Sequence, residues 1–178
     1  KNIFIDVVKE YIGLDHVDSL HGLEQVDIVA TAYETGQLND SFDTILCTAV
    51  LEHLEEPEKA LREAFRILRP GGYAIYTAPL FWHLHEEPRD FYRFTKHGLT
   101  YLFEKVGFEI VVLYPCGGFW ITLGSELNYY LYSFSRGILS PVIPLLYAGV
   151  NFSCFFLNRL HKAERFTWAY LLIVRKPA

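Results

Sequence analysis

Residues 42–79, FDTILCTAVLEHLEEPEKALREAFRILRPGGYAIYTAP, decide the fold of this chain. Residues 44–47 are a short, partly β-branched apolar run, which is typical of a buried strand. Pro57 suits the first turn of a helix, after which apolar residues recur with helical spacing at Leu61, Ala64, Phe65 and Leu68. Pro70-Gly71-Gly72 is expected to end this helix, and residues 73–77 to form a second strand. A strand, a helix and a strand in this order predict a βαβ unit with parallel strands.

The composition is that of one folded domain spanning residues 1–178. Hydrophobic residues make up 51% of the chain and aromatic residues 16%, which is too apolar for a disordered protein. The net charge of −5 argues against a broad nucleic-acid-binding surface. Cys47, Cys116 and Cys154 are isolated and odd in number, and Lys1-Asn2 precedes too short an apolar run for a signal peptide. We therefore expect a reduced, cytoplasmic chain.

The flanking sequence adds strands and one helix to the βαβ unit. Tyr11 to Asp15 is expected to form one strand, and residues 25–30 the next. Thr95 is a plausible cap for a helix that ends at Gly107. Residues 108–113 and 168–174 predict two further strands. Residues 1–9 fit either a strand or the end of an amphipathic helix.

The segments FDTILCTAVLEHL and EKALREAFRILRPGGYAIYTAP resemble the middle of class I S-adenosylmethionine (SAM)-dependent methyltransferases. The resemblance extends on both sides and, more weakly, into the last strand. It implies an α/β fold, a Rossmann-like three-layer sandwich of the SAM-methyltransferase type whose last strand is antiparallel. The family's first strand and Gly-rich SAM loop do not precede Tyr11. We therefore expect an N-terminally truncated member that, as residues 1–178 alone, binds SAM weakly or not at all.

The resemblance also implies where SAM would bind. Asp15 corresponds to the acid that holds the ribose hydroxyls, a contact that suits a carboxylate at the end of a parallel strand. Asp18 is a rival for this role, and a simple turn or cap role for Asp15 remains open. The other expected cofactor contacts are Thr31, Ala32, Thr48, Ala49 and Val50. Because Thr31 stands where the family often has an acid, Thr31 and Ala32 would contribute backbone groups.

Residues 85–95, HEEPRDFYRFT, are similar to a substrate-side loop of the family with the pattern H-x-x-P-x-D-(F/Y)-(Y/F)-R-(F/Y)-T. The resemblance implies a substrate-binding role for Arg89, Asp90, Tyr92 and Arg93. His85 is the first candidate for a general base and His53 the second, because the pKa of an imidazole lies near neutral pH. The alternative is a packed loop in which Arg93 pairs with Asp90 for structure.

We expect no metal site. In some members of the family, a Glu-x-x-Glu-His sequence after the fourth strand binds a divalent metal, but Ala49 stands here in place of the first Glu. Glu52 and His53 alone provide too few ligands for a hard cation. We expect both side chains to hydrogen-bond the loop backbone and shape the pocket.

Residues 120–166 form an apolar helical insertion before the last strand. No residue from 137 to 158 is charged, but Pro141, Pro144 and Gly149 interrupt the run, so a broken pair of helices fits better than a membrane span. Three roles remain open: a lid over the acceptor pocket, a subunit interface such as that of a homodimer, or peripheral membrane contact. We expect the helices to fold back onto the open edge of the sheet and the mouth of the acceptor pocket.

The residues and the resemblance together predict SAM-dependent methyl transfer to oxygen or nitrogen of a small-molecule or lipid-linked acceptor. The protein would then be cytoplasmic, with membrane association as one role of the insertion. The alternative is a non-catalytic, methyltransferase-like module that docks a partner or a membrane through residues 120–166.

Overall fold

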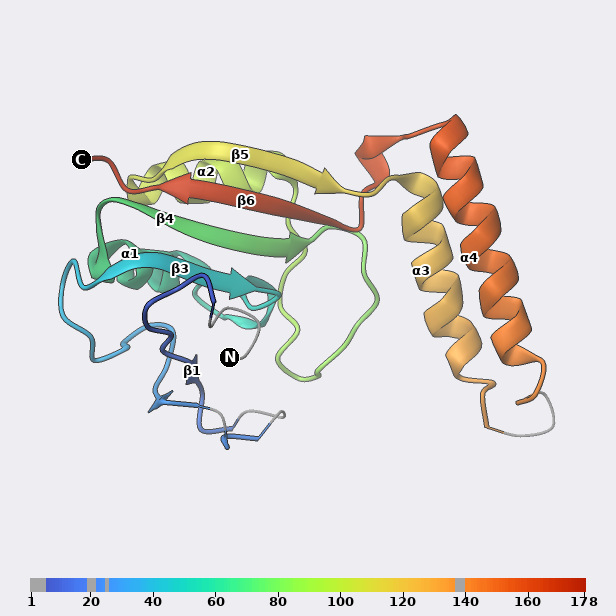
Figure 1. The fold of residues 1–178 in the computed structure, drawn as a ribbon, viewed down its shortest axis with the longest axis horizontal. Coiled ribbons are helices and arrows are strands. Elements are labelled where there is room, and N and C mark those ends of the chain that lie inside the picture. Colours follow the sequence, from blue (N-terminus) through green and yellow to red (C-terminus); the bar gives the residue numbers. More distant parts are fainter. Residues whose placement is uncertain (1–5, 19–21, 25, 137–139) are drawn as a thin grey trace.

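The computed structural model describes the chain except for residues 1–5, 19–21, 25 and 137–139. Its centre is a four-stranded sheet in the order β3-β4-β6-β5 (Figure 1). The strands are β3 (Phe42–Thr48), β4 (Leu68–Pro79), β5 (Glu109–Cys116) and β6 (Ala169–Arg175). β3 is parallel to β4, whereas β6 is antiparallel to both β4 and β5, so the predicted antiparallel last strand is confirmed.

A separate two-stranded parallel sheet pairs β1 (Leu14–Asp15) with β2 (Ile28–Val29). β2 is shorter than the strand expected over residues 25–30, and Gln25 lies outside the described residues, as does most of the ambiguous segment 1–9. Within the described part of the chain, β3 pairs with β4 alone, so its other edge carries no strand. The two sheets therefore remain separate.

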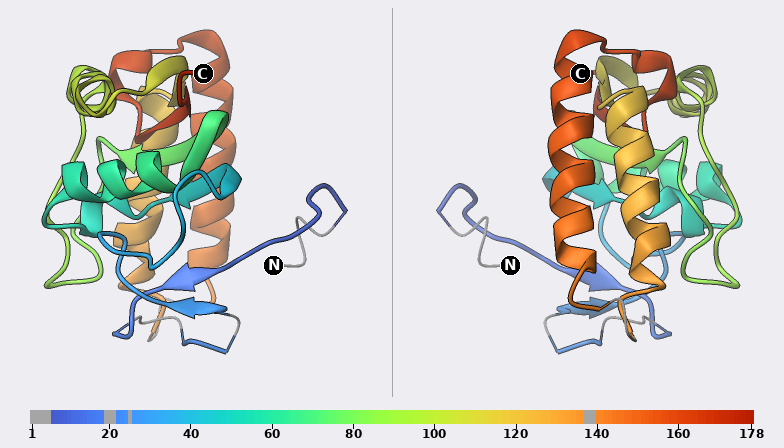
Figure 2. Two further views of the ribbon diagram at one scale, coloured as in Figure 1. Left: turned by 90° about the vertical axis from the view of Figure 1, so that its left-hand side faces the viewer. Right: turned by 90° about the vertical axis from the view of Figure 1, so that its right-hand side faces the viewer.

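Helices α1 (Pro57–Ile67) and α2 (Lys96–Val106) cover one face of the large sheet (Figures 1 and 2). Pro57 occupies the first turn of α1, as expected. The hydroxyl oxygen of Thr95 accepts a hydrogen bond from the Gly98 amide at 3.1 Å, and Gly107 ends α2 in the left-handed conformation, so both predicted ends of α2 are confirmed. The core between helices and sheet is formed by Leu61, Leu68, Leu99, Phe103, Leu172 and Val174.

The segment Pro70-Gly71-Gly72 does not end α1, which was the expectation. The helix ends at Ile67, and β4 begins at Leu68 and continues through this segment to Pro79. The strand register jumps from Phe42 opposite Leu68 to Thr44 opposite Tyr73. Gly72 permits the close approach, because a Cβ there would lie 2.9 Å from the carbonyl oxygens of both Arg69 and Asp43.

The α/β fold class is confirmed, and of its expected three layers the described residues build the sheet and one helical layer. No described helix covers the opposite face of the sheet (Figure 1), where Leu46, Tyr73 and Tyr114 are exposed.

Residues 120–166 do form helices, but these do not fold back onto the edge of the sheet. They contact the loop after β4, where Tyr129 packs against Trp82. α3 (Phe119–Tyr132) and α4 (Ile143–Leu160) lie side by side as a hairpin beyond the ends of the strands (Figures 1 and 2). The short 3₁₀ turn η2 (Glu164–Phe166) then leads into β6. Thr122 fixes the base of the hairpin by donating a hydrogen bond to the Phe166 carbonyl at 2.6 Å. Among the described residues, no helix is both long and apolar enough to cross a membrane.

Candidate active site

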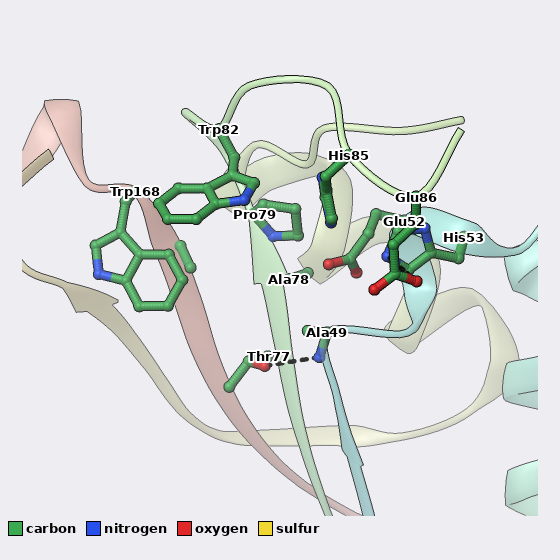
Figure 3. A pocket seen from close by; sticks show the side chains of 11 residues that line it. Ala49, Glu52, His53, Thr77, Ala78, Pro79, Trp82, His85, Glu86 and Trp168 are labelled. Atoms are coloured by element: carbon green, nitrogen blue, oxygen red, sulfur yellow. Dashed lines mark hydrogen bonds and ion pairs between the residues drawn. The ribbon is translucent and has the colours of Figure 1, made fainter. Parts of the chain in front are cut away.

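A pocket of about 240 Å³ opens where the parallel strands β3 and β4 end (Figure 3). Ligands commonly bind at the carboxyl ends of parallel strands in α/β folds. The pocket is lined on one side by Trp82, Trp168 and Pro79, and on the other by Glu52, His53, His85 and Glu86. It therefore combines apolar walls with a small group of titratable side chains.

A tight turn after β3 brings the acidic and imidazole groups to the pocket. Ala49 has a positive φ of 52°, which is unusual for a residue with a side chain. Its amide donates a hydrogen bond to the Thr77 hydroxyl at 3.0 Å, which ties the turn to β4. The 3₁₀ turn η1 (Leu51–His53) follows directly and places Glu52 and His53 beside the pocket.

Glu52 is the residue whose role the sequence interpretation missed. Its exposure is only 2%, yet its Oε2 atom has no hydrogen-bond partner among the described residues. The backbone carbonyl of Glu52, rather than its side chain, accepts hydrogen bonds from the amides of Phe91 and Tyr92. Burial raises the pKa of the Glu52 carboxyl above its ordinary value. A buried carboxyl oxygen in a pocket wall without a protein partner is suited to contact a ligand.

The hydrogen bonds of the two histidines determine which ring nitrogen carries the proton. His53 Nδ1 lies 2.6 Å from the Arg89 carbonyl, and His85 Nδ1 lies 3.2 Å from the His83 carbonyl. Because a carbonyl only accepts hydrogen bonds, each Nδ1 must be the donor. Each Nε2 of a neutral ring is then the nitrogen that can accept a proton. The two rings meet edge to face, with centroids 4.8 Å apart.

Asp90 and Arg93 form the ion pair that holds the loop, which is the structural alternative left open above. The Asp90 side chain is 2% exposed and accepts hydrogen bonds from Arg93 Nη1 and Nη2 at 2.5 and 2.8 Å. The guanidinium keeps the pKa of the Asp90 carboxyl well below its ordinary value. Asp90 Oδ2 also accepts from the His85 amide at 3.0 Å and lies 3.5 Å from His85 Nδ1. The carboxylate therefore orients His85.

None of the four residues predicted to bind substrate lines the pocket, and the remaining two, Tyr92 and Arg89, contact other segments. The Tyr92 hydroxyl donates to the Glu55 carbonyl at 2.9 Å. Arg89 reaches from the loop to the turn after β1, where its Nη2 lies 3.2 Å from Asp18 Oδ2. Because the Arg89 carbonyl also contacts His53, this residue shows that the ends of β1 and β3 face a common region.

The predicted cofactor residues divide into two groups. Ala49 lines the pocket, next to Thr48 and Val50 at the end of β3. Asp15 ends β1, and its Oδ1 accepts a hydrogen bond from the His16 amide at 2.7 Å. Thr31 and Ala32 follow β2, where the Thr31 hydroxyl accepts from the Glu34 amide at 3.2 Å. The second group belongs to the separate sheet β1-β2 and does not line the pocket.

One cluster of metal-ligating groups lies within the described residues. Glu52, His53 and His85 each offer one ligand atom, and these three atoms lie within 4.8 Å of one another. The sequence pattern contained only the first two. A carboxylate with two imidazoles suits a transition metal better than magnesium, which prefers oxygen ligands. The absence of a bound metal in the active protein stays a prediction.

The comparisons with known proteins agree with this fold. Residues 4–76 match the model of a methyltransferase domain family. Among curated proteins, a ubiquinone biosynthesis O-methyltransferase of Alkalilimnicola ehrlichii is 31% identical over 106 residues, which cover 53% of this chain and 40% of that protein. A protein of the same name from Xanthomonas oryzae pv. oryzae is 37% identical over 73 residues, 38% of this chain and 29% of its own length.

The solved structures extend the similarity to nearly the whole chain. A SAM-dependent methyltransferase from Archaeoglobus fulgidus superposes with a TM-score of 0.61 at 15% identity, covering 98% of this chain and 80% of that one. The chain is therefore similar to methyltransferases, in sequence over residues 4–76 and in fold over nearly its whole length. A putative methyltransferase from Bacillus halodurans gives a TM-score of 0.58 at 16% identity, covering 99% and 86% of the two chains. The [4+2]-cyclase SpnF shares the fold as well, with a TM-score of 0.53 at 21% identity, covering 84% of this chain and 55% of that one.

These numbers limit what the relatives imply. The chain spans less than half the length of the curated relatives that it matches, and the solved structures agree in fold rather than closely in sequence. The cyclase adds that this methyltransferase fold also occurs in a protein named for another reaction. The activity must therefore be argued from the site.

Proposed function

We propose that the protein containing this chain transfers a methyl group from SAM to an oxygen or nitrogen of a small-molecule or lipid-linked acceptor. The observation that carries the proposal is the pocket at the ends of β3 and β4, where His85, oriented by Asp90, faces the buried carboxyl of Glu52. A base held by a carboxylate beside a ligand-sized pocket suits the deprotonation of a hydroxyl or an amine.

The acceptor-side roles follow from the contacts. His85 Nε2 takes the proton of the acceptor, and the ionised Asp90 stabilises the imidazolium that forms. Glu52 Oε2 accepts a hydrogen bond from a polar group of the acceptor and so fixes its orientation. Trp82 and Trp168 provide flat apolar walls, which favours an acceptor with an aromatic or isoprenoid part. Among the loop residues, Asp90 and Arg93 act as positioning residues.

SAM would supply an electrophilic methyl group on a positively charged sulfur. The chain offers Asp15 for its ribose hydroxyls and the backbone of Thr31, Ala32 and residues 48–50 for the remainder. These residues fit that use because they follow the ends of β1, β2 and β3, and the contacts of Arg89 bring the first and third of these ends together.

The test compares SAM binding by the full-length protein, its variants and the isolated segment 1–178, using titration calorimetry. Asp15→Ala should weaken binding by about 1–3 kcal/mol, because charge-assisted hydrogen bonds to the ribose are lost. Asp18→Ala is the matched control and should leave the affinity unchanged, since its carboxylate contacts Arg89. If the control alone weakens binding, Asp18 is the ribose ligand. The segment 1–178 tested alone should bind weakly or not at all, because no described strand pairs with the other edge of β3.

Transfer itself is measured with methyl-labelled SAM and an organic extract of cells as the acceptor pool. Label should enter the extract with the wild-type protein and fall by about 100-fold with His85→Gln, the usual loss for a general base. Activity should survive EDTA. Loss on chelation that magnesium, manganese or zinc restores would instead identify Glu52, His53 and His85 as metal ligands.

The alternative function remains the non-catalytic docking module. The exposed hairpin α3–α4 favours it, because the hairpin stands apart from the sheet. A full-length protein that neither binds SAM nor transfers label would support this alternative.

A further inference from the structure

The outer surface of the hairpin α3–α4 is more apolar than the surface of a helix that faces water. On α4 the largest exposed side chains are Leu145, Leu146, Phe152, Phe155, Phe156 and Leu160, with Phe152 76% and Leu145 73% exposed. On α3, exposed apolar side chains recur with helical spacing at Leu123, Leu127 and Tyr130, and Phe134 extends this stripe. A helix that faced water here would carry charged residues on this side.

The inner surface of the hairpin is already fully used. Ile143 and Cys154 are buried, and Gly124 of α3 approaches α4 so closely that a Cβ on it would lie 3.0 Å from Cys154. Asn128 donates a hydrogen bond to Asn151 at 2.7 Å and links the two helices in their uncharged part. The exposed apolar side chains therefore do not take part in the contacts between α3 and α4.

The exposed apolar side chains of α4 spread over half of the helix circumference. At 100° per residue, the directions from Phe155 through Phe152 and Phe156 to Leu146 span about 180°. A helix packed against one partner helix needs an apolar stripe of about 100°. A helix with side chains has a radius of about 5 Å. When such a helix lies about 5–10 Å deep in a lipid surface, lipid contacts half or more of its circumference. This arc therefore fits a lipid surface better than a second copy of the chain.

The charges around the hairpin add a preference for anionic lipid. Residues 117–168 contain four Lys or Arg and two Asp or Glu, whereas the whole chain has a net charge of −5. The basic residues lie at both ends of the hairpin: Arg136 follows α3, while Arg159, Lys162 and Arg165 lie at or beyond the end of α4, and all are exposed. Between these ends the two helices carry one acid, Glu126, which lies beside His83 of the loop after β4. Basic ends with so little negative charge between them suit a hairpin that lies flat at the headgroup level.

We propose that the hairpin α3–α4 is an interfacial membrane element that lies in the plane of an anionic bilayer with its apolar outer surface in the acyl boundary. Tyr129, which is exposed on α3, packs against Trp82 of the pocket wall at 5.0 Å between ring centroids. Glu126 of α3 lies 3.2 Å from His83 of the same loop. A docked hairpin would therefore hold the pocket next to the lipid. That an acceptor reaches the pocket from the bilayer rests on the proposed function, whereas membrane binding does not.

The experiment is flotation of the full-length protein with vesicles of phosphatidylcholine alone or with 30% phosphatidylglycerol, without SAM or acceptor. We expect the wild-type protein to float with the anionic vesicles, at least tenfold more than with neutral ones, and to float less at high salt, which screens the basic ends. Phe152→Ser with Phe156→Ser should abolish flotation. The matched control, Leu38→Ser with Tyr101→Ser, removes exposed apolar side chains far from the hairpin and should float like wild type.

Circular dichroism and size-exclusion chromatography with light scattering complete the test. The Phe152/Phe156 double variant should keep the wild-type spectrum and unfolding midpoint, because these side chains are exposed. The proposal is overturned if the wild-type protein does not float, or if the folded double variant floats as well as wild type. A wild-type dimer that the double variant converts to a monomer, without flotation of either, would show that a second copy covers this surface. A wild-type protein that does not float but binds SAM would overturn membrane binding and leave the proposed function standing. A wild-type protein that floats but does not bind SAM would overturn the proposed function and leave membrane binding standing.

Discussion

Helices α1 and α4 show two different relations to their surroundings. The inner face of α1 buries Leu61 and Ile67, while its outer face carries ion pairs such as Glu58 with Arg62 at 2.7 Å and with Lys105 at 2.6 Å. α4 buries Ile143 and Cys154 on its inner face but exposes phenylalanine and leucine where α1 exposes charge. The difference shows that the side chains on the outer face of a helix indicate whether that face meets water or an apolar environment. The outer face of α1 suits water, whereas the outer face of α4 suits an apolar environment.

The strongest test of this comparison removes one large apolar side chain from each region. Phe103→Ala should lower the free energy of unfolding by about 3–5 kcal/mol, because Phe103 is fully buried against Tyr76 and Phe108. Phe156→Ala on α4 should change it by less than about 0.5 kcal/mol in water. Urea unfolding followed by circular dichroism measures both. A large loss from Phe156→Ala would mean that the hairpin surface is covered in solution.

A second test compares a buried ion pair of the pocket loop with the exposed pair of α1. Asp90→Asn should destabilise the protein by about 2 kcal/mol at pH 7, because Arg93 loses its partner in a largely buried position. Glu58→Gln is the control and should cost much less, because solvent screens the exposed ion pairs of Glu58.

The pH dependence of the Asp90 variant has a definite sign. Since the pKa of Asp90 is lowered by folding, its contribution is complete above the ordinary range of aspartate, near pH 4, and is lost as the pH falls through the lowered value. The stability difference between wild type and Asp90→Asn should therefore shrink below about pH 4. A difference that stays constant down to pH 3 would contradict the assignment.

Sequence alone predicted the elements whose signals are local. Pro57, Thr95 and Gly107 mark helix ends through backbone chemistry that needs no tertiary context, and all three are found where expected. Pro70-Gly71-Gly72 was misinterpreted because the same residues that end helices also permit an irregular strand, and only the approach of Asp43 decides between the two. The expectation that the hairpin folds back onto the edge of the sheet was also wrong, since apolar composition does not tell whether a helix faces a sheet or a membrane.

The candidate site shows the same limit. His85, His53 and Ala49 could be named from their motifs, and all three line the pocket. The buried, unpartnered state of Glu52 depends on how a loop more than thirty residues later closes over it through Phe91 and Tyr92. The nearest sequence signal was its position beside His53, and this signal did not separate a structural carboxylate from a functional one.

The smallest expected effect on stability is a gain from Glu52→Gln. This substitution tests whether the Glu52 carboxyl contacts a ligand or stabilises the folded structure. Burial raises the pKa of Glu52, so the ionised form destabilises the folded state at neutral pH. Glu52→Gln removes this charge and should raise the free energy of unfolding by up to about 1 kcal/mol at pH 7.5, while lowering kcat/KM for methyl transfer by about 10- to 100-fold. Because protonation of Glu52 has the same effect as the substitution, the gain should vanish as the pH falls to the ordinary range of glutamate, near pH 4.

Urea unfolding between pH 4 and 8, together with the label-transfer assay, measures both quantities. A variant that loses stability and keeps its activity would show that the Glu52 carboxylate holds the loop instead of the acceptor.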